Sequence, residues 1–153
     1  MNRYLIFRTD RIGDFLISAI LIKSIKRNDT SSHVTVIASK KNYDYIKSFK
    51  LVDEVILLKN NFFEKVKLII KLRSIIYKKI IIHDNKKRSF LISFFLKVKK
   101  KISINNFLHL SHLEIIKKIL STFNYSISKS DLNILDEKKI NKLDKKNYVL
   151  LHF

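Results

Sequence analysis

The 153-residue sequence predicts an α/β domain in which a parallel β-sheet is covered by helices on both faces. Strand-like and helix-like segments alternate through the first hundred residues, as they do in chains built from β-α-β units. The strand-like run 79–83 contains three consecutive isoleucines, which is typical of a strand buried on both faces. A hydrophobic fraction of 46% over this length suits one globular domain with a substantial core.

The expected strands are short runs of β-branched, aromatic and other apolar residues. They are residues 3–8, 33–38, 54–58, 79–83 and 101–104. The expected helices are segments in which apolar side chains recur every three or four positions. They run from Asp14 to the polar cluster at 27–32, and over 40–49, 61–77, 87–96 and 112–123. A further strand is expected at 148–151.

The composition excludes several classes of protein. The absence of cysteine excludes a disulfide scaffold, a zinc finger and a thiolate nucleophile. One glycine and no proline are too few for a P-loop or a dinucleotide-binding fingerprint, each of which needs several glycines. No apolar run approaches the roughly 20 residues of a membrane-spanning helix, and the N-terminus has no signal-peptide pattern. We therefore expect a cytoplasmic protein.

The charge is strongly positive, because 32 Lys and Arg residues face 13 Asp and Glu residues and leave a net +19. Lysine, isoleucine and asparagine are abundant together, which an AT-rich coding sequence produces whatever the function. We give this compositional origin more weight than a selected polyanion site. A charge of this size nevertheless attracts nucleic acid and anionic membranes without specificity.

The single glycine, Gly13, lies between the first expected strand and the first expected helix. This junction falls at the carboxyl edge of a parallel sheet, where ligands bind. Glycine there serves either a tight turn or the close approach of a ligand, and the sequence leaves both open. Asp14 follows, and is either a helix N-cap or a carboxylate placed to accept a proton from a hydroxyl.

Other charged groups have two interpretations each. Residues 86–88 follow the fourth strand and could bind phosphates or carboxylates, although a solvated charge run is the simpler interpretation. The lysines within 97–101 either face an anionic membrane or are solvated. Residues 83–84 are cleft residues or turn-forming hydrogen bonders. His109 and His112 have a spacing that a metal could use, but no carboxylate pattern accompanies them, so we expect no metal.

The segment RTDRIGD at 8–14, between an N-terminal strand and an apolar helix, resembles glycosyltransferase family 9, the lipopolysaccharide heptosyltransferases. Further motifs resemble the family in the same order along the chain. They are LVDEVI at 51–56, IIIHDN at 80–85 with KRS at 87–89, the segment 99–105 and HLE at 112–114. The resemblance extends over essentially the whole chain.

The resemblance implies a Rossmann-like domain equivalent to the N-terminal half of a two-domain GT-B glycosyltransferase. Residues 1–146 would form the acceptor-side domain, and 147–153 would begin a second, donor-binding domain that is missing. It also implies an inverting transfer from ADP-heptose to a lipopolysaccharide precursor. We expect the chain to be truncated and inactive alone.

Site residues are carried over on the matching motifs. Asp14 matches the family's catalytic aspartate and would be the general base. The remaining candidates would shape the loop or bind the acceptor, and they are Thr9, Asp10, Arg11, Gly13, Lys87 and Arg88. The implied partners are a nucleotide-sugar donor, which needs the second half, and a lipid-linked oligosaccharide acceptor. Neither a metal nor another cofactor is implied, and peripheral contact with the inner face of the inner membrane is a further expectation.

Two alternatives remain open. One is a nonenzymatic basic α/β module that binds nucleic acid or an anionic membrane, and the other is a decayed or frameshifted fragment without activity. A concentrated basic face with interleaved aromatic residues would favour the basic module. Positive charge centred on a cleft at Arg8, Arg11 and Arg88 would favour the transferase, with no specific nucleic acid as partner.

Overall fold

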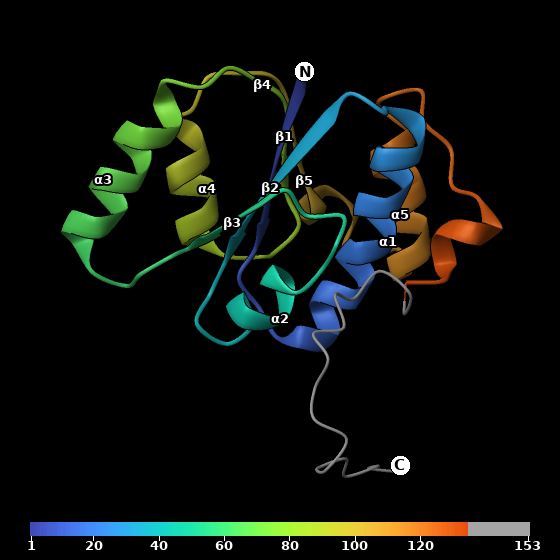
Figure 1. Cartoon of the computed structure of the whole chain (residues 1–153), viewed down its shortest axis with the longest axis horizontal. Helices are drawn as coiled ribbons and strands as arrows, with labels where there is room; N and C mark the ends of the chain where they lie inside the picture. Colours follow the sequence, from blue (N-terminus) through green and yellow to red (C-terminus); the bar gives the residue numbers. More distant parts are fainter. Residues whose placement is uncertain (135–153) are drawn as a thin grey trace, which may run out of the picture.

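The computed structural model describes residues 1–134 and confirms the predicted α/β class (Figure 1). Within that range the chain forms a five-stranded sheet in the order β3-β2-β1-β4-β5, and every neighbouring pair is parallel. The strands are β1 (Asn2–Arg8), β2 (Ser32–Ala38), β3 (Glu54–Leu57), β4 (Tyr77–Ile82) and β5 (Val98–Ser103). The strand expected at 148–151 and the domain boundary expected at 146 lie outside the described residues.

Helices cover both faces of the sheet, as predicted (Figure 1). The face covered by α1, α2 and α5 and the face covered by α3 and α4 have separate hydrophobic clusters. The helices are α1 (Ile12–Asn28), α2 (Tyr43–Lys47), α3 (Phe62–Arg73), α4 (Lys87–Phe94) and α5 (His112–Ser121), with 3-10 turns η1 (Ile104–Phe107) and η2 (Lys129–Leu132). Within 1–134 none of these helices has the length and hydropathy that a membrane span requires.

The central strand β1 supplies both clusters because successive side chains of a strand point to opposite faces. Tyr4 and Ile6 pack toward α1 and α5, whereas Leu5 and Phe7 pack toward α3 and α4. All four are completely buried. The unbroken apolar run that predicted a doubly covered strand therefore describes β1 as well as β4.

Some predicted boundaries are wrong. The helix predicted over 61–77 ends at Arg73, because Tyr77 already pairs with Val98 in the sheet and its ring is buried there. The helix predicted over 40–49 shrinks to α2. The strand predicted over 101–104 starts earlier and ends at Ser103, because β5 is an edge strand with exposed lysines that mask its pattern.

A closed polar network lies at the amino edge of the sheet, around the buried carboxylate of Asp29. Its Oδ2 accepts hydrogen bonds from the Tyr4 hydroxyl at 2.7 Å, the Asn2 amide at 2.9 Å and the Lys78 ammonium at 3.0 Å. Burial alone would raise the pKa of Asp29, but these donors outweigh it and hold that pKa below its usual range.

Candidate functional site

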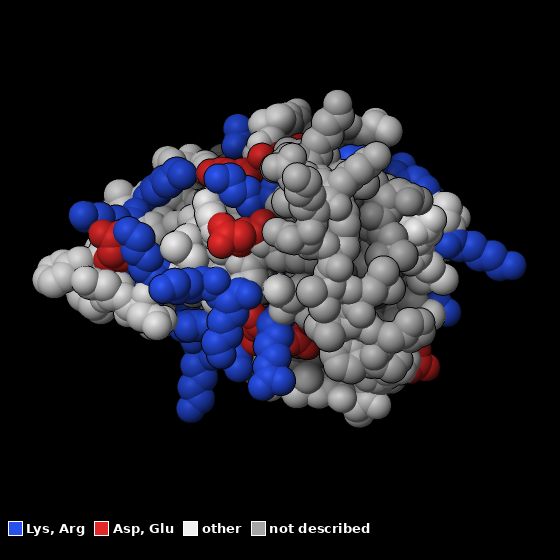
Figure 2. All heavy atoms as spheres, turned by 60° about the horizontal axis from the view of Figure 1, so that its bottom comes forward, with Lys and Arg blue, Asp and Glu red and all other residues white. Residues whose placement is uncertain are grey.

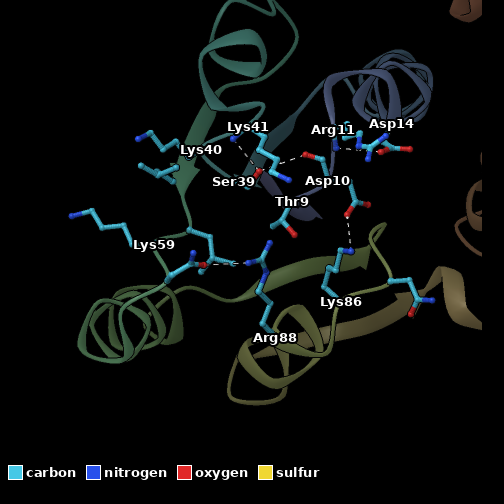
Figure 3. A pocket seen from close by; sticks show the side chains of 14 residues that line it. Thr9, Asp10, Arg11, Asp14, Ser39, Lys40, Lys41, Lys59, Lys86 and Arg88 are labelled. Atoms are coloured by element: carbon cyan, nitrogen blue, oxygen red, sulfur yellow. Dashed lines mark hydrogen bonds and ion pairs between the residues drawn. The ribbon is translucent and has the colours of Figure 1, made fainter.

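A cavity of about 850 Å³ opens at the carboxyl edge of the sheet (Figure 3). The segments that follow β1, β2, β3 and β4 all contribute to its wall. The lining residues are Thr9, Asp10, Arg11, Asp14, Ser39, Lys40, Lys41, Leu57, Leu58, Lys59, Asn60, Asn85, Lys86 and Arg88. Ligands of open parallel α/β sheets bind outside this edge, so the cavity lies where the sheet topology predicts a site.

Asp14 lies inside the first turn of α1, because this helix begins two residues earlier than the start predicted at Asp14. Helix α1 begins at Ile12, and the Asp14 carboxylate reaches back so that its Oδ2 accepts a hydrogen bond from the Arg11 backbone N–H at 3.2 Å. This is the third-residue position of a capping box rather than an N-cap. The side chain is 41% exposed and lines the cavity, so a ligand can reach it.

Gly13 does not form the tight turn that was one of the two expectations for it. It lies within helix α1 with an ordinary negative φ, so no tight turn requires a glycine there. A Cβ at this position would meet no atom within 4 Å, and Gly13 is not among the residues that line the cavity. The structure therefore gives no backbone reason for glycine at this position.

Arg8 is buried at the end of β1 and ties the loop after this strand to the end of β4. Its Nε donates to the Asp14 backbone carbonyl at 2.9 Å, and its Nη1 donates to the His83 carbonyl. Its guanidinium also lies 3.7 Å from the Asp10 carboxylate and 3.8 Å from the Asp14 carboxylate. Burial lowers the pKa of Arg8, and the nearby carboxylates oppose that effect. Arg8 therefore links the start of α1 to the end of β4 through buried hydrogen bonds.

Asp84 holds the same loop through a single carboxylate oxygen. Its Oδ2 accepts the Thr9 backbone N–H at 3.1 Å, the Thr9 hydroxyl at 2.5 Å and the Ser89 hydroxyl at 2.9 Å. The other oxygen, Oδ1, is buried and has no hydrogen-bond partner within residues 1–134. Burial raises the pKa of Asp84, the Asp10 carboxylate adds to the rise, and the Thr9 and Ser89 donors only partly offset it.

His83 is buried beside this cluster, and its Nδ1 lies 2.6 Å from the Ser18 hydroxyl. Burial, together with the positive charges of Arg8 and His112, lowers the pKa of His83 to about 3. The imidazole is therefore neutral at physiological pH. Of the two interpretations offered for residues 83–84, the structure supports internal hydrogen bonders, because neither residue lines the cavity.

Cations surround the carboxylates of the cavity. Its lining includes six Lys and Arg residues: Arg11, Lys40, Lys41, Lys59, Lys86 and Arg88. Lys86 lies 3.6 Å from the Asp10 carboxylate, and the Arg88 guanidinium donates to the Asn60 side chain at 3.3 Å. Lys40 and Lys59 lie at the rim and point outward (Figure 3). Figure 2, which turns this edge toward the viewer, shows the same mixture of acidic groups flanked by Lys and Arg.

The structure brings together most of the predicted site residues. Thr9, Asp10, Arg11, Asp14 and Arg88 line the cavity, whereas Gly13 and Lys87 do not. Lys87 is the first residue of α4 and is exposed outside the cavity. The preceding residue, Lys86, lines the cavity wall instead.

Sequence reasoning missed the contributions of the segments after β2 and β3. They are Ser39, Lys40, Lys41, Lys59 and Asn60. A usable signal was present, because these polar residues follow expected strands and the carboxyl ends of parallel strands meet at one edge.

The comparisons with known proteins agree with this architecture. No protein-family model and no curated protein sequence matches the chain. Its structure is similar to that of Escherichia coli heptosyltransferase WaaC with ADP, with a TM-score of 0.67 and 13% identity over 83% of this chain. It has a glycosyltransferase-like fold.

Two further solved structures share that fold. A glycosyltransferase of family 9 from Veillonella parvula matches 90% of this chain with a TM-score of 0.66 and 11% identity. The Escherichia coli ADP-heptose lipopolysaccharide heptosyltransferase II matches 67% with a TM-score of 0.56 and 20% identity. The matched regions are 49% of WaaC, 43% of the Veillonella protein and 30% of heptosyltransferase II, so this chain spans about half their length or less. The resemblance stated from sequence is confirmed at the level of fold.

Proposed function

We propose that this chain is the acceptor-binding part of an inverting glycosyltransferase that uses a nucleotide-activated sugar. One observation carries the proposal: the accessible Asp14 carboxylate lies in a cation-lined cavity at the carboxyl edge of a sheet with a glycosyltransferase-like fold. Arg11 and Arg88 line this cavity, and charge centred on a cleft favours a transferase over a nonenzymatic basic module.

In the proposed reaction Asp14 is the general base. Its carboxylate accepts the proton of an acceptor hydroxyl, and the freed oxygen forms a bond to the anomeric carbon of the donor. The bond from that carbon to the nucleotide diphosphate breaks at the same time, and the configuration inverts. The cations of the wall bind anionic groups of the acceptor, such as phosphates or carboxylates, and so position the hydroxyl beside Asp14.

The supporting residues hold the loop that leads into α1 and the first turn of α1, which carries Asp14. Arg8 donates to the Asp14 carbonyl, and Asp84 accepts from the Thr9 backbone N–H, so hydrogen bonds hold this segment at both of its ends. Lys86 pairs with Asp10 across the cavity wall, which balances the charge of the loop. Precise placement of a general base matters, because small displacements of reacting groups reduce the rate steeply.

The finer assignments belong to the same proposal. Structures of the similar protein WaaC contain ADP and ADP-2-deoxy-2-fluoro heptose, which supports ADP-heptose as donor class here. We infer a lipid-linked oligosaccharide of lipopolysaccharide as acceptor, at the inner face of the inner membrane. Residues 1–146 would form the acceptor side, and the donor would require a second domain beginning at 147–153.

Calorimetry with a deacylated, phosphorylated core oligosaccharide tests the acceptor assignment on the chain as it exists. Lys86→Ala/Arg88→Ala removes two cations from the cavity, and Lys117→Ala/Lys118→Ala removes two from the exposed surface of α5. We expect the cavity pair to weaken binding by about tenfold or more, since a hydrogen bond between charged groups contributes about 1.5–3 kcal/mol. Equal losses in both pairs, or equal affinity for the dephosphorylated oligosaccharide, would contradict the assignment.

A further inference from the structure

Helices α3 and α4 carry an exposed apolar surface on the side that faces away from the sheet. Their inner sides are buried in one hydrophobic cluster, which contains Leu68 and Leu72 of α3 and Ile92 of α4. The opposite sides carry large apolar side chains, which we name the apolar ridge. It consists of Phe62, Phe63, Val66 and Ile70 on α3, Leu91 and Phe94 on α4, and Phe95 immediately after α4.

The exposure of the ridge is unusual for its residue types. Phe62, Phe63 and Phe94 are 72%, 73% and 75% exposed, although phenylalanine is normally buried. Phe62, Val66 and Ile70 are spaced four residues apart and therefore form one continuous stripe along α3. At the end of the molecule formed by α3, uncharged atoms project between Lys and Arg side chains (Figure 2). Contiguous exposed apolar surface of this kind marks a contact with a partner or a membrane.

The charge around the ridge is strongly positive. Helix α3 itself carries Lys65, Lys67, Lys71 and Arg73 against a single acidic residue, Glu64. Lys101 lies 5.9 Å from the centre of the Phe94 ring, so cation and aromatic ring share one surface. On the α3 side, Glu64 is paired with Lys59 and Lys67, and Glu54 is paired with Lys71. The nearby acidic groups are therefore neutralised, and the complementary partner is anionic.

We propose that the apolar ridge binds the chain to an anionic lipid bilayer. Its aromatic and aliphatic side chains enter the interfacial region, and the surrounding lysines bind lipid phosphates. This inference rests on the proposed function only in one respect, which is that a lipid-linked acceptor gives the chain a reason to bind a membrane. The surface itself is argued from exposure and charge.

The mixture of side chains favours a bilayer over nucleic acid. Stacked bases use aromatic faces, and a single-strand-binding surface pairs aromatic rings with cations. The apolar ridge also contains Val66, Ile70 and Leu91, which contribute no stacking but transfer favourably from water into the lipid interface.

The ridge is placed suitably for a lipid-linked acceptor. Asn60 lines the cavity, and α3 begins two residues later with the exposed Phe62. A bilayer that contacts the start of α3 therefore lies beside the mouth of the cavity, within reach of an acceptor sugar whose lipid stays in the membrane.

A single tryptophan reports insertion directly, because the chain contains none. Phe63→Trp places the probe on the ridge, and Leu132→Trp places it on the opposite side of the sheet, where Leu132 of η2 is also exposed. We expect vesicles of phosphatidylcholine with phosphatidylglycerol to shift the emission of Phe63→Trp to the blue and not that of Leu132→Trp. Pure phosphatidylcholine vesicles should give little shift, and about 1 M salt, where the Debye length is about 3 Å, should weaken binding.

A second variant separates insertion from simple charge attraction. Phe62→Ser/Phe63→Ser/Phe94→Ser should lower vesicle affinity by about tenfold or more, because each ring removes apolar area from water on insertion. Unchanged vesicle binding by this variant would overturn the proposal, as would an equal shift of both tryptophan probes or no shift at Phe63→Trp. If high protein concentration shifts the emission of Phe63→Trp without vesicles, the ridge contacts a second copy of the chain, and the proposal is wrong. If only single-stranded nucleic acid produces the shift, the ridge binds nucleic acid instead of a bilayer. The vesicles hold no sugar acceptor, so failure here leaves the transferase proposal separately testable.

Discussion

The two edges of the sheet each bury an aspartate, and their surroundings are opposite. At the amino edge, Asp29 accepts hydrogen bonds from phenol, amide and ammonium groups, and its pKa is lowered. At the carboxyl edge, Asp84 receives donors on one oxygen only, and burial together with the negative charge of Asp10 raises its pKa. Burial raises the pKa at both positions, and only at Asp29 do the hydrogen-bond donors outweigh it.

The difference separates a structural carboxylate from one beside a site. A carboxylate saturated by donors, including a cation, stabilises the fold and has no capacity left for chemistry. The surroundings of Asp84 are energetically unfavourable, because a buried carboxylate oxygen without a hydrogen-bond partner is disfavoured. Asp84 binds the loop between β1 and α1, which lines an open cavity. Functional sites commonly contain such locally unfavourable arrangements.

The largest expected effect concerns Asp14 itself. With this chain joined to a donor-binding domain, Asp14→Asn should lower turnover by about 10²–10⁴, the usual contribution of a general base. Asparagine retains an oxygen that can accept the Arg11 N–H, so the melting temperature should shift little. Steady-state kinetics and thermal denaturation of the same preparation measure both quantities.

The two measurements for Asp14→Asn discriminate between roles. The affinity for the acceptor should change far less than turnover, because the lost interaction is made in the transition state. A large fall in melting temperature with turnover nearly intact would make Asp14 a structural residue like Asp29 and remove the main support for the proposed base.

The second expected effect is a loss of stability on acidification through His83. Its folded-state pKa of about 3 lies below the ordinary 6.5, so the unfolded chain binds the extra proton between these values. The free energy of unfolding is therefore unaffected by His83 above about pH 6.5. Below that pH it falls by up to about 1.4 kcal/mol per pH unit. Chemical denaturation between pH 6.5 and 4.5 should show this slope, and His83→Asn should flatten it. A slope that persists unchanged in the variant would assign the effect to other groups.

The paired aspartates provide a third test. Asp29→Asn should lower the free energy of unfolding by about 2 kcal/mol, because charge-assisted bonds from Lys78 and Tyr4 weaken. Asp84→Asn should change it by less than about 1 kcal/mol, since asparagine can still accept from Thr9 and carries no charge to bury. Urea titrations at neutral pH compare the two directly. Similar losses at both positions would remove the distinction between the two edges.

The fold was predictable from sequence because its signal is local. Strands β1, β2 and β4 are apolar runs that fall within one or two residues of the predicted bounds. The edge strand β5 was partly missed because only its end is buried, and exposed lysines carry no strand signal. The end of α3 was misplaced because apolar residues at 75–77 continue its helical spacing into the next strand.

The candidate site was predictable as a location and less so as an arrangement. Residues that follow β1 and β4 were expected at one edge, and most of them line the cavity. The contacts that support them join residues 75 positions apart, Arg8 to His83 and Thr9 to Asp84, and no periodicity encodes such pairs. The position of Asp14 within α1 also depends on where the helix starts, which sequence gives least reliably.

The smallest expected effect concerns Gly13, the only glycine of the chain, at the carboxyl edge. Gly13→Ala adds a methyl group that meets nothing within 4 Å and occupies a helical backbone conformation without strain. Alanine should raise the free energy of unfolding by about 0.5 kcal/mol, because glycine loses more backbone entropy on folding. Calorimetric binding of the phosphorylated oligosaccharide should be unaffected, since Gly13 does not line the cavity. If the alanine variant is more stable but loses acceptor affinity by tenfold or more, the ligand approaches the backbone at this residue, and glycine is there for binding rather than folding.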